Sequence, residues 1–483
     1  MALVYKQNYS NIMNLRRTTY IAIACATTLI GLFLAKYITP IPGDWFFVSV
    51  VLLPLYFSSK TRVIFVGTTF LILGLWRGGV LQADYQQFAT HYGEKVTITG
   101  YAIEDATYSY NGQLETTLQL TTVNGQPASG KVTLRGYTEP ALYRNDNIEA
   151  TGKLQSTLGG KQGRMSYADL NVVSRSNSII EKVRKNFIVG MQNALPEPAA
   201  SLGTGILVGQ RSLLPDDVSS ALQIAGLTHI VAVSGYNLTI IINAVKRLSR
   251  RLSRFQTVGI SAALIYVFLL ITGFSPSIVR ASLVAGLGMA AWYYGREFRP
   301  IVLILFAAAV TGFVNPYYVW GDIGWYLSFL AFFGVLVVAP LLVKLFAKGK
   351  TELPLLPTVA IESFSAQVMT LPLSMFVFAK ISSIGFIANI LIVPLVPFAM
   401  LASFAAGLSG MFMPLYAGWV ALPARVLLNT MIHTSEWLAK LPHALSYVQV
   451  SAASMVGMYC IYAVVLVGLK KRTQSVIIKE SSN

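Results

Sequence analysis

The amino-acid sequence predicts a polytopic α-helical membrane protein with an inserted all-β domain, and three observations support this fold class. Hydrophobic residues make up 54% of the 483 residues and charged residues only 12%, about half the charged share of soluble domains. Several apolar runs approach the length that crosses a bilayer. Between residues 81 and 185 these runs stop, and a period-two alternation typical of β-strands replaces them. The composition excludes a disordered chain, a disulfide scaffold and a purely soluble enzyme.

Residues 1–80 are predicted to form an N-terminal membrane segment with three spans. Apolar runs cover about residues 20–34, 44–57 and 63–80. The polar stretch before the first run carries basic residues and resembles the start of a signal peptide. Because no clear small-residue cleavage site follows, we expect this run to be retained as a span.

Residues 81–177 are predicted to form the β domain. The alternation is clear in 96–101, 114–123, 131–137 and 147–154, and Asn-Gly pairs mark tight turns between strands. Residues 81–185 hold eleven basic and ten acidic side chains, so this part is nearly neutral. The net charge of +17 therefore lies almost entirely in the membrane part.

Residues 178–223 are predicted to form an amphipathic interfacial helix followed by a linker. Apolar side chains recur at helical spacing from Ile180 to Leu195, with Glu181 and Arg184 among the charged residues on the opposite face. The rest of this segment is too polar and broken to predict a span.

Residues 224–472 are predicted to form a second membrane domain, and 473–483 a cytoplasmic tail. Residues 414–438 are ambiguous because charged residues interrupt them, so the expected total is about 10–12 spans. The spans expected in this domain are 227–245, 257–275, 278–295, 300–315, 323–343, 357–378, 383–409 and 449–469.

Basic residues between the predicted spans indicate the orientation. They fall on one face of the membrane if residues 414–438 span it, and the positive-inside rule makes that face cytoplasmic. The N- and C-termini are then cytoplasmic and the β domain is extracellular. The basic groups are Lys246, Arg247, Arg250, Arg251 and Arg254; Arg296 and Arg299; Lys344, Lys348 and Lys350; and Lys470, Lys471 and Arg472.

Several motifs, in a fixed order, carry a resemblance to a known family. They are Leu207-Val208-Gly209-Gln210-Arg211, Asp216-Asp217, Gly226-Leu227-Thr228-His229 with Ser234-Gly235, Ser275-Pro276-Ser277-Ile278-Val279-Arg280-Ala281, Asp322-Ile323-Gly324-Trp325-Tyr326-Leu327-Ser328 and Gly385-Phe386-Ile387-Ala388-Asn389 with Val393-Pro394-Leu395. In this order they resemble the ComEC-type competence channel family, which takes transforming DNA through the bacterial inner membrane. The β insert is similar to that family's extracellular oligonucleotide-binding (OB) fold.

The resemblance implies a passive channel in the bacterial plasma membrane for uptake of single-stranded transforming DNA. The implied partners are single-stranded DNA, the lipid bilayer, a cytosolic ATP-driven DNA translocase, an extracellular DNA receptor and a separately encoded nuclease. The sequence resembles the form that lacks a C-terminal metallo-β-lactamase-like nuclease domain, because its four histidines form no His-x-His-x-Asp-His cluster. A second departure is Asn237, where the family often has His. We expect no catalytic residue, no metal and no cofactor.

Polar residues inside apolar segments of the sequence are the candidates for the DNA path. They are His229, Ser234, Asn237, Arg280, Asp322, Glu362, Gln367 and Asn389. Arg280 either forms an interhelical ion pair, with Glu362 or Asp322 as counter-charge, or faces a hydrated path and meets phosphates. Gln367 and Asn389 suit either helix–helix hydrogen bonding or pore lining. His229 and Ser234 suit polar contacts at a helix break, pore lining or, in a different class, an intramembrane hydrolase.

The β domain offers a second set of candidates, because aromatic faces with interleaved cations suit stacking on single-stranded DNA. The candidates are Tyr101, Tyr108, Tyr110, Lys131, Arg135 and Arg144, with Tyr137 and Tyr143 nearby. The near-neutral charge argues against strong electrostatic capture, and about half of the tyrosines are expected in the core. The alternative to a DNA channel is a transporter of another polyanion or a small solute with the same membrane architecture.

Overall fold

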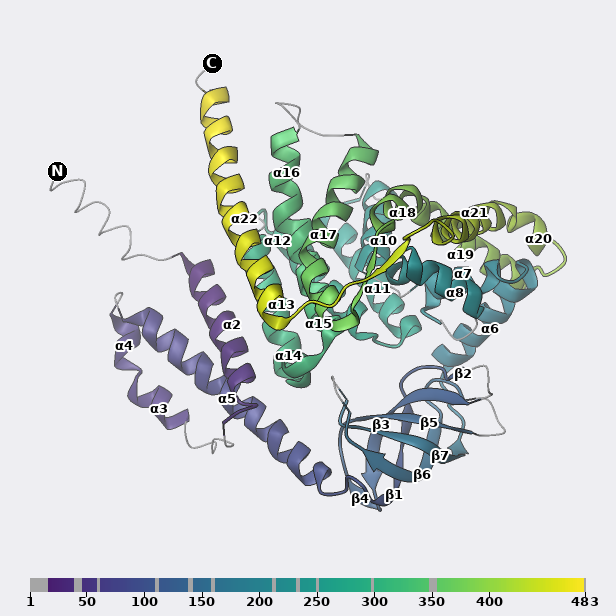
Figure 1. Cartoon of the computed structure of the whole chain (residues 1–483), viewed down its shortest axis with the longest axis horizontal. Helices are drawn as coiled ribbons and strands as arrows, with labels where there is room; N and C mark the ends of the chain where they lie inside the picture. Colours follow the sequence, from purple (N-terminus) through teal and green to yellow (C-terminus); the bar gives the residue numbers. More distant parts are fainter. Residues whose placement is uncertain are drawn as a thin grey trace. The chain divides into compact units, whose positions relative to one another are not determined.

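The fold is seen in a computed structural model, which divides into two compact units. The first unit comprises residues 1–176 and 286–326, and the second comprises 177–285 and 327–483. Figure 1 draws the chain. The residues described are 16–38, 46–58, 61–108, 113–137, 142–157, 161–210, 214–231, 235–248, 252–296, 299–346 and 354–481.

Within these residues, seven helices are long and apolar enough to cross a membrane, which confirms the multi-span fold class. Two shorter apolar helices, α10 (Gly235–Leu248) and α13 (Pro300–Val314), lie where spans were expected and account for part of the difference from the expected 10–12 spans. A third, α7 (Ala199–Val208), lies in the segment expected to be a linker. The seven are α2 (Arg17–Leu34), α5 (Arg62–Ala89), α11 (Arg254–Thr272), α15 (Ile323–Phe333) continued by the π-helix η2 (Gly334–Val338) and α16 (Ala339–Phe346), α17 (Leu355–Phe378), α18 (Gly385–Ile392) continued by η3 (Val393–Leu395) and α19 (Val396–Phe412), and α22 (Ala452–Ser481).

Two expected spans have a different form. In place of a span over 44–57, the described residues form α3 (Phe46–Val51) and α4 (Pro54–Phe57), which both pack on α5. Pro54 lacks a backbone N–H and starts a new helix rather than continuing α3. Residues 414–438 include α20 (Ala417–Val420) and most of α21 (Leu422–Ala439), and α21 is not among the seven helices that meet the span criteria in the described part of the chain.

In the first unit, glycines bring α2 and α5 into backbone contact. A Cβ built on Gly31 would lie 2.3 Å from the Leu71 carbonyl oxygen, and one on Gly74 would lie 2.4 Å from that of Thr28. Small residues of this kind let membrane helices approach closely and gain van der Waals contact. Helix α13 packs against α2, and the Arg77 guanidinium donates to the carbonyl oxygen of Val314 at its C-terminal end, 3.0 Å away.

The β domain is a closed barrel of the expected OB type. Strand β1 pairs with both β3 and β6, the order continues through β5 and β7, and the β5–β7 pair is parallel. Five long strands thus close on themselves and leave no free edge. The strands are β1 (Lys95–Ala102), β2 (Thr107–Tyr108), β3 (Leu114–Val123), β4 (Gln126–Pro127), β5 (Lys131–Tyr137), β6 (Asn147–Gln155) and β7 (Gly163–Ser174).

The C-terminal end of α5 anchors the barrel within the first unit. Phe88, on the last turn of α5, is buried in the same hydrophobic cluster as the barrel residues Ile98 and Leu154. Tyr92 packs edge-on against Phe88 and donates a hydrogen bond to the carbonyl oxygen of Gln162. The helix therefore supplies part of the hydrophobic core of the β domain.

The second unit contains the segment for which we expected an interfacial helix and a linker. Helix α6 (Ile179–Ala194) packs along α19, and its buried face includes the Glu181–Arg184 ion pair, 3.6 Å apart. Val183, predicted on the apolar face, is exposed. The expected linker contains α7, which lies in the core of the unit, and α8 (Asp216–Ile224).

A short sheet closes the second unit at one end. Strands β8 (Lys380–Ser382) and β9 (Leu445–Tyr447) pair in antiparallel fashion, which places the end of α17 beside the chain entering α22. The Tyr459 hydroxyl donates to the Met369 carbonyl oxygen at 3.1 Å, so α22 runs back along α17. Figure 1 shows the axes of α16, α17 and α22 roughly aligned with one another, whereas the axis of α21 lies across them.

Candidate functional site

The outer face of β3 and β5 is the first place where predicted residues gather. OB folds use this face, with the loops that flank it, to bind oligonucleotides. Arg135 is exposed there, and its Nη2 lies 2.9 Å from Oε2 of Glu115, its direct partner on β3. Tyr101 is exposed on the neighbouring β1 and pairs with Gln119 in the β1–β3 register.

A network of the barrel's own groups covers the middle of this face. Nζ of Lys161 donates to Oγ1 of Thr117 at 2.9 Å, and Thr117 donates to Oε1 of Glu104 at 2.9 Å. Thr117 is buried although it points outward from β3. A polyanion on this part of the face would have to displace Glu104.

Lys131 and Asp322, predicted for two different sites, interact with each other in the first unit. Burial lowers the pKa of the Lys131 ammonium below its ordinary value, while the carboxylates of Asp322 and Glu104 act in the opposite direction. Asp322 also caps α15, because its Oδ1 accepts from the Trp325 backbone N–H at 2.8 Å. Asp322 therefore serves local structure and faces a cation of the barrel.

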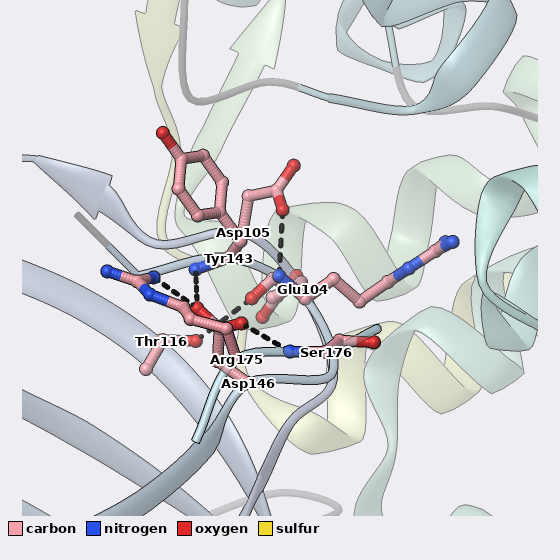
Figure 2. A network of polar contacts seen from close by, with 8 residues as sticks. Glu104, Asp105, Thr116, Tyr143, Asp146, Arg175 and Ser176 are labelled. Carbon is pink, nitrogen blue, oxygen red and sulfur yellow. Dashed lines mark hydrogen bonds and ion pairs between the residues drawn. The ribbon is translucent and has the colours of Figure 1, made fainter. Parts of the chain in front are cut away.

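Arg144 does not lie on an open binding face, because it is only 5% exposed. Its backbone N–H donates to Oδ1 of Asp105 at 2.9 Å, next to the Asp146 network of Figure 2. Asp146 is fully buried and accepts from Arg175, from the Tyr143 N–H at 3.1 Å and from the Ser176 N–H at 3.2 Å. This carboxylate ties the loop before β6 to the end of β7. Tyr110 and the side chain of Tyr108 lie outside the described residues.

The second gathering place is the start of α10, in the second unit. A Cβ on Gly235 would lie 3.0 Å from that of Ala281 on α12 (Pro276–Tyr293), so these helices touch there. Tyr236 interacts electrostatically with Glu362 of α17. Asn237 is 1% exposed, and its Nδ2 donates to the Ile206 carbonyl oxygen of α7 at 3.0 Å. One helix start thus joins α7, α12 and α17.

Arg280 is the residue before Ala281 and is 4% exposed. A buried guanidinium in an apolar helix is costly unless it is paired, hydrogen-bonded or hydrated. Arg280 on α12 and Glu362 on α17 thus lie on helices that contact α10 near Asn237. Tyr236 also belongs to this group. The sequence did not identify it, because a tyrosine within an apolar segment carries no distinctive pattern.

His229 and Ser234 are not seen as a pair. His229 lies on α9 (Thr228–Val231), where its Nδ1 is 3.2 Å from the Gly226 carbonyl oxygen, and Ser234 lies outside the described residues. Within the described ranges, no group of three His, Cys, Asp or Glu residues is arranged to hold a metal ion.

Gln367 and Asn389 belong to a polar cluster where α17 meets α18. A Cβ on Gly385 would lie 3.3 Å from Nε2 of Gln367, and Asn389 is four residues further along α18. Asn389 is 9% exposed. Among the described residues, Oε1 of Gln367 and Oδ1 of Asn389 have no hydrogen-bond partner. Ser382 also belongs to the cluster, because its hydroxyl donates to the Ile224 carbonyl oxygen at 2.6 Å.

Comparisons with known proteins agree on one family. Residues 206–473 match the family described as "Competence protein". The chain is also similar to "ComE operon protein 3" of Bacillus subtilis (strain 168), with 28% identity over 247 residues. That alignment covers 50% of this chain and 31% of the Bacillus protein, so the chain matches about a third of its relative's length. No solved structure matches the chain.

Proposed function

Because the chain belongs to the competence protein family, we propose that it is a passive inner-membrane channel for uptake of single-stranded transforming DNA. Each nucleotide carries a negative charge that must be kept out of hydrocarbon. Only polar groups and water inside a helix bundle can provide such a path. The proposal therefore requires polar positions in the interior of the second unit.

The observation that carries the proposal is the pair of amide oxygens on α17 and α18. Gln367 and Asn389 lie on helices that count as membrane spans, and their side-chain oxygens have no hydrogen-bond partner among the described residues. A buried polar atom that protein groups leave unsatisfied costs about 1–3 kcal/mol unless water reaches it. These atoms favour a hydrated interior over dry packing.

The charged groups at the start of α10 would serve the same path. Arg280 would supply a cation that can meet phosphates, and Glu362, which interacts with Tyr236 at the start of α10, would supply an anion that limits how tightly they are held. A polymer must be released as readily as it is bound, because a tightly binding cationic site would stop its movement. A few scattered polar groups suit conduction better than a basic cluster.

The remaining steps of uptake belong to other proteins in this proposal. A cytosolic ATP-driven DNA translocase would pull the strand, an extracellular receptor would deliver the DNA, and a separately encoded nuclease would degrade the second strand. We assign no catalytic step to this chain. Its N- and C-termini would be cytoplasmic and the β barrel extracellular, as the basic inter-span groups indicate.

The test is substitution of Arg280, read out as transformation frequency and as uptake of fluorescent single-stranded DNA. We expect Arg280→Ala to lower both by at least tenfold, on the order of one charge-assisted contact, and Arg280→Lys to restore part of the loss. Arg425→Ala is the matched control, because Arg425 is exposed on α21.

Protein level and thermal stability of each variant separate a transport defect from misfolding. Gln367→Leu and Asn389→Leu provide a second measurement, because leucine is similar in size, needs no water and would dry the path. Normal uptake by Arg280→Ala together with both leucine variants would overturn the channel proposal.

A further inference from the structure

Tyr167 stands on a strained bulge of the barrel and is 80% exposed. Its φ of 56° lies in the left-handed region, which a bulky side chain rarely adopts. In the register of β5 with β7, Leu134 pairs with Met165 and Gly136 with Ala168. Between these two pairs β7 therefore advances by three residues and β5 by only two. Tyr167 lies in the stretch of β7 that contains the extra residue.

The strands on both sides of the bulge are adapted to it. A Cβ on Gly136 of β5 would lie 2.1 Å from the Ala168 carbonyl oxygen, and one on Gly152 of β6 would lie 3.3 Å from the Ala168 Cα. Glycine thus occupies the two positions on the neighbouring strands where a side chain would crowd the backbone of the bulge. Bulges of this kind re-aim side chains, and backbone strain of this kind concentrates at functional sites. Here the strain holds an aromatic ring in solvent.

A second exposed ring and a cation lie beside Tyr167. Tyr137 ends β5, is 53% exposed and pairs with Asp169 of β7. Strand spacing and rise place the two tyrosine Cα atoms on the order of 8 Å apart. Arg135 is exposed two residues before Tyr137, and its ion pair with Glu115 is at the surface, where such pairs contribute little to stability. A phosphate can replace Glu115 at little cost.

We propose that Tyr167 and Tyr137 form a stacking site for unpaired bases, with Arg135 contacting the backbone, so that the barrel holds single-stranded DNA on β5 and β7. This inference rests on the proposed function and names a contact for its substrate. Single strands fit and duplexes do not, because only unpaired bases expose both faces to a ring. Stacking also suits a nearly neutral domain, in which phosphate attraction alone is weak.

Tyr167→Gly tests the proposal without a folding ambiguity. Glycine adopts positive φ freely, so the variant should melt at the same temperature as the wild type or higher. Its affinity for a labelled single-stranded oligothymidine should fall on the order of tenfold, as expected for loss of one stacked base. The measurement is fluorescence anisotropy with the full chain in nanodiscs at one fixed salt concentration.

Three further arms complete the experiment. Tyr167→Phe keeps the ring and should bind within twofold of the wild type, and Tyr137→Ala should weaken binding as Tyr167→Gly does. Tyr447→Ala removes an equally exposed tyrosine on β9 and should leave affinity unchanged. A duplex of the same length should bind more weakly than the single strand and should not distinguish Tyr167→Gly from the wild type.

The proposal is overturned if Tyr167→Gly binds the oligothymidine as the wild type does, or if the wild type does not bind it. Neither result removes the channel function, which Arg280→Ala tests separately by uptake. A loss of uptake in Arg280→Ala with normal oligonucleotide affinity would show that the two sites act independently.

Discussion

Lys131 holds its amino group in a half-buried position on the barrel, where it interacts with the carboxylates of Asp322 and Glu104 and with the ammonium group of Lys161. Burial lowers its pKa below the ordinary value of 10.5. Between the lowered pKa and 10.5, the unfolded chain therefore binds more protons than the folded chain. Folding stability rises with pH across that window.

The first prediction follows from this increase of folding stability with pH. We expect the melting temperature of the wild type, relative to that of Lys131→Met, to increase from about pH 8 to 10, because methionine cannot titrate. Thermal unfolding of the full chain in detergent measures it. Comparing the two curves cancels the contributions of all groups that the two proteins share. Lys153→Met, at an exposed position of β6, is the control for removing a lysine from the barrel. Parallel curves for the wild type and Lys131→Met would contradict the prediction.

The sequence shows which residues are polar within an apolar segment, but it does not show which groups they contact. Asn237 and Arg280 are buried, as polarity within a predicted span suggests. The Asn237 amide reaches Ile206, 31 residues earlier, on a helix that we expected to be part of a linker. Arg144 shows that the local sequence can also mislead. An arginine near tyrosines suggests a nucleic-acid contact, but the fold buries Arg144. Residue type predicts a chemical capacity, whereas the neighbours that use it are set by tertiary packing.

At the scale of helices, small residues decide which elements touch. Gly190 of α6 meets Gly407 and Gly410 of α19, and a Cβ on Gly410 would lie 1.8 Å from the Gly190 carbonyl oxygen. The sequence predicted an interfacial position for α6 from its charged face. Periodicity could not show that Glu181 and Arg184 pair and turn inward, because one helix pattern fits both a lipid surface and a protein groove.

The second prediction concerns this contact. Gly410→Ala should destabilise the chain by about 2 kcal/mol or more, because the new methyl group overlaps backbone that cannot move aside alone. Gly418→Ala, on α20 with no atom near the added methyl group, should change stability by less than about 1 kcal/mol. Thermal unfolding of both variants gives the comparison. Equal melting temperatures would mean that α6 does not pack on α19 as described.

At the scale of the whole molecule, the pairing of β8 with β9 determines which ends of the membrane helices in the second unit lie on the same side. Because Ile381 pairs with Ser446, residues 383–444 leave and return to the same end of α17. Helix α22 then runs back along α17 and ends on the side where α17 begins. The basic residues Lys344 and Lys470 therefore share a side, and this holds whether or not residues 414–438 cross the membrane. From the sequence alone, Lys344 and Lys470 fall on the same side only if residues 414–438 are assumed to cross the membrane.

The last prediction uses this geometry to fix the orientation. In a chain with Cys25 and Cys460 replaced by serine, Phe346→Cys and Lys470→Cys should react with a membrane-impermeant maleimide only after the cells are permeabilised, because the positive-inside rule places both in the cytoplasm. Lys153→Cys in the barrel and Tyr447→Cys at the opposite end of α22 should react in intact cells. Different behaviour of Phe346→Cys and Lys470→Cys would contradict the antiparallel course of α17 and α22. Reaction of all four in intact cells would instead contradict the orientation, and with it the direction in which a DNA strand would enter.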